Sequence, residues 1–285
     1  MILRCRALPV CTMKSKEWAS ECSQGGNKIL LAETILLDID EALYTRRMHA
    51  QHNGSVQVGI ETFPRGSAPS RHRHLEGYAS VVLAGSFVEA GFGGRVEVEP
   101  GDVLFHGRFD CHANRSSCSR AVQILRLPWM DVWVEGHFSI TDPDLVARLA
   151  ERDPRESMVA LAENIQAVKT PLQHWTGTLA SALQSTASLS LRRWAGEVGM
   201  RPEALSRGFQ HEFGVSPKQF RLEARARRAW LEIQRSPRTL TTIAHDFGFS
   251  DLAHLSRSVR SLTGYPPSAW RSRGPDSPLT QFRSS

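Results

Sequence analysis

Two related stretches near the C-terminal end decide the fold: LSRGFQHEFGVSPKQFR at residues 205–221 and IAHDFGFSDLAHLSRSVRSLTGYPPSAWR at residues 243–271. Each contains a Leu-Ser-Arg triplet followed by a glycine, a proline, an aromatic residue and an arginine. Leu191 matches Leu240 and Leu205 matches Leu255, so the offset grows from 49 to 50 residues along the repeat. Chance rarely keeps so many positions in register, and the sequence therefore predicts a duplicated helical unit.

Each copy has the outline of a helix-turn-helix unit. Its first helix carries apolar residues at i, i+3, i+4 and i+7, and Ser190 and Thr239 stand where N-caps belong. Gly199 and Gly248 then interrupt the helix, and a second helix with exposed basic residues follows. In the second copy, the apolar stripe of this helix is predicted at Leu252, Leu255, Val259 and Leu262.

A long helix is predicted between the two copies, opening at Ser216-Pro217. Its apolar side holds Leu222, Ala226, Ala229 and Ile233, and the other positions include Arg221, Arg225, Arg227 and Arg228. Because a continuous helix is stiff, it should keep the two units at a fixed separation.

These segments together resemble the tandem helix-turn-helix domain of AraC/XylS-type transcriptional regulators. The match covers about Ser188 to Arg273 and is specific, because both units, the linking helix and the closing Pro-Pro-aromatic segment appear in order. The resemblance implies a bacterial protein that binds double-stranded DNA sequence-specifically. Its two recognition helices would enter successive major-groove segments on one face of the duplex.

The resemblance, carried over residue by residue, implies recognition helices from about Pro202 to Phe213 and from about Asp251 to Thr263. The side chains implied in DNA binding are Glu203, Ser206, Arg207, Gln210, Ala253, His254, Ser256, Arg257 and Arg260. Their chemistry fits, because arginine can pair with guanine, glutamine with adenine, and alanine can touch the thymine methyl group. Core positions by their spacing are Leu205, Phe209, Leu255 and Val259. Gly208 costs about 1 kcal/mol in helix propensity, which indicates either close packing or a weaker first unit.

Positive charge is concentrated in the repeated region. Residues 188–285 hold 16 Lys and Arg against 8 Asp and Glu, whereas the preceding residues hold 19 against 21. This distribution is expected of a region that contacts phosphates, although a basic solvated surface is the alternative interpretation.

The first half of the chain predicts β-structure. Short valine-rich or alternating runs occupy residues 56–60, 79–83, 95–99 and 122–125, with Gly and Pro between them, which is typical of a sandwich or small barrel. Two segments resemble the cupin motifs. The first is Gly66, then five residues, then His72-Arg73-His74, with Gly85 further on, and the second is Pro100-Gly101-Asp102 followed by His112 and Asn114.

The predicted effector-binding and metal-binding residues of this barrel are His72, His74, Glu76 and His112. On a strand the first three would share one face, and imidazole with carboxylate suits zinc, iron, nickel or manganese as a divalent metal. Metal-binding cupins usually place the carboxylate later, where Tyr78 and Ala79 stand here. An organic effector, with or without a metal, is therefore favoured over a tight metal site, and His106 is interpreted as an ordinary strand histidine.

The predicted fold class is multidomain α+β, a cupin-like β-barrel with following helices and then an all-α domain. The predicted parts are a flexible leader at 1–27, the effector-binding barrel at 28–135, a helical dimerisation or linker region at 136–187, the DNA-binding domain at 188–273 and a flexible tail at 274–285. The intermediate helices either carry dimer contacts or cover the barrel. A homodimer is favoured, because a two-fold protein matches paired DNA half-sites.

The five cysteines have no C-x-x-C spacing and predict reduced thiols in a cytoplasmic protein, with oxidant sensing at Cys111 and Cys118 as an alternative. No apolar run approaches the roughly 20 residues that span a bilayer. We therefore expect a DNA-binding transcriptional regulator, not an enzyme, that senses a small-molecule effector and has RNA polymerase as a further partner. Two alternatives stay open: a metal-dependent cupin enzyme, such as an oxygenase or isomerase, targeted to DNA, and a barrel that only dimerises.

Overall fold

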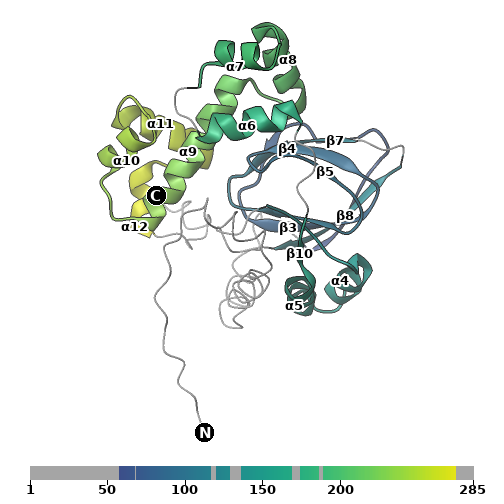
Figure 1. The fold of residues 1–285 in the computed structure, drawn as a ribbon. Helices are drawn as coiled ribbons and strands as arrows, with labels where there is room; N and C mark the ends of the chain where they lie inside the picture. Colours follow the sequence, from purple (N-terminus) through teal and green to yellow (C-terminus); the bar gives the residue numbers. More distant parts are fainter. Residues whose placement is uncertain are drawn as a thin grey trace.

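The N-terminal half forms two antiparallel β-sheets. The computed structural model describes residues 58–67, 69–116, 120–128, 136–168, 174–185 and 189–273. The larger sheet has the order β1 (Gly59–Phe63), β8 (Val122–Pro128), β3 (Tyr78–Ala84), β6 (Asp102–His106), β9 (Gly136–Ser139) and β10 (Gln166–Ala167). The smaller sheet has the order β2 (His72–Arg73), β7 (Cys111–Ser116), β4 (Phe87–Gly91) and β5 (Gly94–Val98). Figure 1 shows the smaller sheet lying over the larger one.

Apolar side chains fill the space between the sheets. Val82, Leu104 and Ile124 of the larger sheet pack with Phe87 and Val98 of the smaller sheet. The predicted strand runs are confirmed, since β1, β3, β5 and β8 overlap them. The predicted fold class is also confirmed, with an antiparallel sheet domain before a helical domain. The described strands form two separate sheets, so closure into a cupin-like barrel stays a prediction.

The predicted leader, the predicted tail and the segments around Cys118 and Trp129–Trp133 lie outside the described residues. Within the part of the chain that is described, no helix combines the length and apolar content needed to cross a bilayer.

Two helices cover the larger sheet. Helix α4 (Pro143–Ala150) begins at the N-cap Asp142, and α5 (Pro154–Asn164) begins at the N-cap Asp153; each cap accepts a backbone N–H, and each helix has proline in its first turn. Their apolar residues, including Val146, Met158 and Leu161, form one core with Val81 and Leu125 of the sheet. Strands β9 and β10 of the larger sheet also lie within residues 136–187, the predicted helical dimerisation or linker region.

The C-terminal part is helical throughout its described elements. These are α6 (Trp175–Ser185), α7 (Leu191–Glu197), α8 (Pro202–Phe213), α9 (Pro217–Arg235), α10 (Leu240–Asp246), α11 (Leu252–Thr263) and α12 (Pro267–Arg273). Ser190 and Thr239 accept backbone N–H groups as the predicted N-caps of α7 and α10. Gly214 and Gly264 end α8 and α11 in the left-handed conformation, at φ 71° and 84°. The two predicted units and the linking helix are confirmed.

One prediction within these helices is wrong. Leu252 was assigned to the apolar stripe of α11 but is 40% exposed, because it lies in the first turn, ahead of the part of the helix that packs on α9. Arg227, outside the predicted apolar stripe of α9, is also buried, and its Nε donates to the Arg108 carbonyl oxygen in the sheet domain at 3.0 Å.

Gly208 in the middle of α8 serves close packing. A Cβ atom at this position would lie 2.8 Å from Cζ2 of Trp175 and 3.0 Å from Cη2. The absence of a side chain therefore lets α6 approach α8, which offsets the poor helix propensity of glycine.

One hydrophobic core joins the smaller sheet to the C-terminal helices. Phe92 packs on Phe220 with ring centroids 5.7 Å apart, and Phe109 meets Trp230 at 4.9 Å and Trp270 at 5.6 Å. In Figure 1, helices α6, α8 and α9 lie beside strands β4, β5 and β7. The sheet and the two helix-turn-helix units are therefore packed together.

We predict that Phe109→Ala lowers the free energy of unfolding by about 3–5 kcal/mol, the usual cost of deleting a buried phenylalanine ring. Phe109 also has φ 58°, a left-handed conformation that penalises every residue with a Cβ atom. Phe109→Gly should therefore be more stable than Phe109→Ala by about 0.5–1 kcal/mol, the reverse of the usual order. Urea unfolding followed by tryptophan fluorescence measures both. Equal stability of Phe109→Ala and wild type would contradict the shared core, and Phe63→Ala at a partly buried position is the matched control.

Candidate DNA-binding surface and histidine cluster

The exposed faces of α8 and α11 carry the side chains implied in DNA binding. On α8, Glu203, Arg207 and Gln210 are exposed and Ser206 is half-buried. The residues expected in the core, Leu205, Phe209, Leu255 and Val259, are completely buried. Each helix thus separates a buried apolar stripe from a polar surface, as a recognition helix requires.

On α11, Ala253, Arg257 and Arg260 are exposed, whereas His254 and Ser256 are half-buried. Asp251 caps the helix by accepting the His254 backbone N–H at 2.6 Å, and this hydrogen bond lowers the pKa of the Asp251 carboxyl group. The His254 ring in turn lies 3.2 Å from the Ser250 hydroxyl group. His254 therefore also takes part in a local contact at the start of the helix.

The end of α8 is held by the sheet domain. The Glu212 carboxylate pairs with Arg95 of β5 and with Arg115 of β7, and its side chain is largely buried. Sequence reasoning did not select Glu212, because its partners lie about a hundred residues away in the chain. The side chains implied in DNA contact occupy the exposed part of the same helix.

Two helix-turn-helix units joined by one continuous helix define this region as a tandem DNA-binding domain. Residues 194–273 match the family model described as "Helix-turn-helix domain". The C-terminal region is therefore a helix-turn-helix domain of the AraC type, the kind found in DNA-binding transcriptional regulators.

Several solved structures are similar to parts of the chain. The C-terminal domain of AraT, a response regulator from Geobacillus stearothermophilus, is 21% identical over 36% of this chain and 88% of its own, with a TM-score of 0.33. An AraC-type transcriptional regulator from Chromobacterium violaceum is 27% identical over 33% of this chain and 87% of its own, with a TM-score of 0.32. ToxT from Vibrio cholerae is 9% identical over 76% of this chain and 96% of its own, with a TM-score of 0.36. No curated protein matches the chain.

A cluster of histidines and carboxylates lies within the sheet domain. The candidate ligand atoms of His72, His74 and His112 all lie within 4.8 Å of one another, and so do those of Glu89, His106 and His112. His72 and His112 face each other across the β2–β7 pair, with ring centroids 4.5 Å apart. The structure therefore brings together three of the four predicted pocket residues.

Glu76, the fourth predicted pocket residue, is placed elsewhere. The expectation that His72, His74 and Glu76 share one face of a strand is wrong, because β2 ends at Arg73. Glu76 instead forms an ion pair with Arg108, Oε2 to Nε at 3.4 Å. Burial raises the pKa of the Glu76 carboxyl group.

His106 belongs to the cluster, whereas the sequence analysis interpreted it as an ordinary strand histidine. Its Nδ1 lies 2.8 Å from Asp110 Oδ2, and its Nε2 lies 3.7 Å from Glu89 Oε2. Glu89 and Asp110 were also missed, since neither falls in a cupin-like motif. The detectable signal for Glu89 was a carboxylate inside the apolar run Phe87–Gly91.

Burial and mutual repulsion keep part of the cluster uncharged. Burial, followed by the neighbouring His112 and His72, lowers the pKa of His74 to about 2, so His74 is a neutral imidazole at physiological pH. Burial also lowers the pKa of His72. Although burial opposes it, hydrogen bonding from His106 and His112 holds the pKa of Asp110 well below its usual range. Neutral imidazoles beside the ionised Asp110 carboxylate are suited to bind a cation or a hydrogen-bonding ligand.

The turn at residues 107–110 connects this cluster to the DNA-binding domain. Asp110 contacts His106 and His112, while the adjacent Phe109 packs against both Trp230 and Trp270. Backbone hydrogen bonds at 2.8 and 3.2 Å pair this turn with His74. Arg108, Phe109 and Asp110 therefore each contact either the histidine cluster or the DNA-binding domain. Arg108 does so through its carbonyl oxygen, which accepts a hydrogen bond from Arg227.

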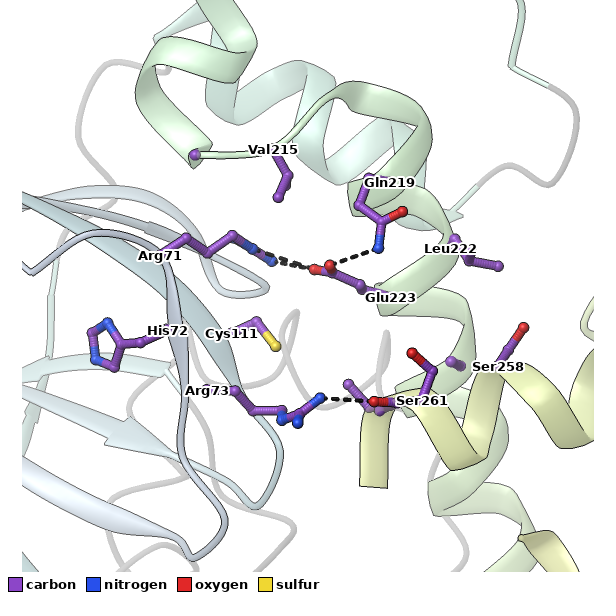
Figure 2. A pocket seen from close by; sticks show the side chains of 13 residues that line it. Arg71, His72, Arg73, Cys111, Val215, Gln219, Leu222, Glu223, Ser258 and Ser261 are labelled. Carbon is purple, nitrogen blue, oxygen red and sulfur yellow. Dashed lines mark hydrogen bonds and ion pairs between the residues drawn. The ribbon is translucent and has the colours of Figure 1, made fainter. Parts of the chain in front are cut away.

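A cavity of about 350 Å³ lies between the sheet domain and helices α9 and α11. Figure 2 shows Arg71 and Arg73 extending from the sheet toward these helices, while His72 points the other way. Arg71 pairs with Glu223 at 2.8 Å, and Arg73 donates to the Ser261 carbonyl oxygen at 3.1 Å. Cys111 also lines the cavity, and burial raises the pKa of its thiol to about 12, which disfavours the reactive thiolate of an oxidant sensor.

We predict that Arg257→Ala weakens binding to the preferred DNA sequence by about 1–3 kcal/mol and relaxes the preference at one base pair, because arginine donates two hydrogen bonds to guanine. Arg192→Ala, which removes the same charge from an exposed position on α7, is the matched control and should leave base preference unchanged. Competition binding against single-base variants of the site measures both. If Arg257→Ala weakened every sequence equally, Arg257 would be a phosphate contact instead.

Proposed function

We propose that this protein is a sequence-specific transcriptional regulator of the AraC type whose N-terminal sheet domain senses an effector. The observation that carries the proposal is the pair of recognition helices, α8 and α11, with polar faces exposed and apolar faces buried around one linking helix. A single stiff helix between the units fixes their separation, so both can read one stretch of duplex.

The proposed base-reading residues supply the chemistry of direct readout. Arg207, Arg257 and Arg260 are guanine donors, and Gln210 is an adenine partner. Other arginines of the basic region would contact phosphates, which makes affinity dependent on salt. We assign Glu203 and Ala253 to the same surface, at the exposed first turns of α8 and α11.

The histidine cluster supports the proposed sensing role. Burying several ionisable groups costs free energy unless they hydrogen-bond or bind a ligand. His74 Nε2 is buried without a hydrogen-bond partner among the described residues, which favours a ligand here. We propose that His72, His74 and His112 bind the effector and that Glu76 holds Arg108 beside the pocket.

The effector signal would pass through the turn at residues 107–110. A ligand that repositions Asp110 would also move Phe109, which packs against both Trp230 and Trp270. Because a close-packed interior transmits small displacements of its side chains, the two helix-turn-helix units would shift relative to the sheets. An effector must favour one of two arrangements to have any effect.

We further propose a cytoplasmic homodimer that contacts RNA polymerase. Helices α4 and α5 use their apolar faces on the larger sheet. Any dimer contact through them would therefore use the outward faces, which include Arg148 and Glu151.

Selection from a random duplex library with the purified full-length chain tests the proposed function. We expect enriched sequences with two base-specific blocks about one helical turn apart, roughly 10 base pairs. Arg207→Ala should relax the preference in one block and Arg257→Ala in the other. No enrichment at moderate salt would overturn the proposal, and a single block would show that one unit alone reads DNA.

A further inference from the structure

Glu89, His106 and His112 come from three different strands and meet inside the sheet domain. Glu89 lies on β4, His106 on β6 and His112 on β7. The Glu89 Oε2 atom is 3.7 Å from His106 Nε2 and 3.9 Å from His112 Nε2. Ligands at 2.0–2.2 Å around a tetrahedral ion lie about 3.3–3.6 Å apart. The two carboxylate-to-imidazole distances are thus within a few tenths of an ångström of the spacing that a small cation imposes, and all three donor atoms lie within 4.8 Å of one another.

The Asp110 carboxylate lies behind the imidazole rings of His106 and His112 and can orient them to bind an ion. Asp110 Oδ2 lies 2.8 Å from His106 Nδ1 and 3.4 Å from His112 Nδ1. Both rings can therefore donate Nδ1–H to Asp110, which leaves the Nε2 atoms on the side of Glu89 as acceptors. The Tyr78 hydroxyl group lies 3.4 Å from His112 Nε2, and an ion at this position would replace that contact. A carboxylate that holds the far nitrogen of a histidine ligand is a recurrent feature of metal sites, because it fixes the tautomer and raises the basicity of the ligand.

The neighbouring set of His72, His74 and His112 is less suited to hold the ion by itself. None of its members is a carboxylate. The nearby Glu76 carboxylate is already paired with Arg108, and Tyr78 stands where metal-binding cupins usually have the carboxylate. His72 and His74 are also only half-buried, whereas Glu89, His106 and His112 are 8%, 3% and 1% exposed. A buried anionic ligand offsets the charge of the ion in a medium of low dielectric constant.

We propose that Glu89, His106 and His112 bind one divalent transition-metal ion of the zinc or iron type, and that this ion regulates DNA binding alongside the effector proposed above for His72, His74 and His112. Two imidazoles and one carboxylate are a donor set that such ions prefer. The second half of this proposal rests on the proposed regulatory function, whereas the binding site does not.

The test of the site is metal titration of the full-length chain, without an affinity tag and stripped with a chelator. Zn²⁺ is titrated by calorimetry, and Co²⁺ by absorption, where nitrogen and oxygen ligands give d–d bands without thiolate charge transfer. We expect one ion per chain. Glu89→Gln and His106→Ala should each weaken affinity at least tenfold, and Asp110→Asn by about 10–100-fold. His245→Ala removes an exposed histidine on α10 and should bind as wild type.

Two results would overturn the site. One is wild-type protein that binds neither ion, which would leave the cluster as a hydrogen-bonded network. The other is retention of wild-type affinity in Glu89→Gln and His106→Ala with loss in His72→Ala and His74→Ala, which would place the ion on the other set. Thermal unfolding of each apo variant separates lost ligands from lost folding, and Glu89→Gln preserves shape if His106→Ala does not fold.

DNA affinity measured with and without Zn²⁺ tests the signal. We expect the ion to change the affinity of the wild-type chain, and Phe109→Leu to bind the ion while losing most of that change. An ion that binds without altering DNA affinity would overturn the signalling role and leave the site intact. Absence of DNA binding under every condition, with metal binding retained, would overturn the proposed regulator instead.

Discussion

The packing of Phe109 against Trp230 and Trp270, which also contact each other, is the contact on which the arrangement of the molecule depends. Trp230 lies on α9, the helix that joins the two helix-turn-helix units, and Trp270 lies on α12 at the end of the second unit. Their edge-to-face contacts with Phe109 are a favourable geometry for aromatic rings. Burial of the ring offsets the left-handed backbone at Phe109, so packing maintains a conformation that the isolated turn would avoid.

Side chains alternate between the two faces of β2 and β7, and this alternation connects the histidine cluster to the DNA-binding domain. His72 of β2 points into the sheet domain, while Arg73 of β2 and the preceding Arg71 reach the helices, as Figure 2 shows. On β7, His112 faces the cluster while Cys111 faces the cavity between the domains. The same backbone therefore forms the wall of the cluster and the docking surface for the DNA-binding domain. A change on one side of these strands can therefore be transmitted to the other through the shared backbone.

The sequence predicts what is set locally and misses what is set by distant partners. The bounds of α8 and α11 follow from the repeat, the caps and the terminal glycines, all within a few residues of the helices they define. The roles of Glu212 and Arg227 depend on partners about a hundred residues away and leave no local pattern. Likewise His72, His74 and His112 were found through motif spacing. Glu89 and His106 were not, because only the pairing of β4, β6 and β7 with their neighbours brings them into the cluster.

The histidine cluster is poorly explained as a stabilising element. Replacing buried ionic groups by apolar residues of similar size is often neutral or stabilising, because desolvation consumes most of the electrostatic gain. An apolar core at these positions would continue the packing that Val82, Leu104 and Ile124 already provide between the sheets. The chain instead places two carboxylates and four imidazoles there, beside the turn at residues 107–110 that packs against the DNA-binding domain. Such a placement makes the docking of that domain depend on whatever the cluster binds, and this dependence is the property that a regulator requires.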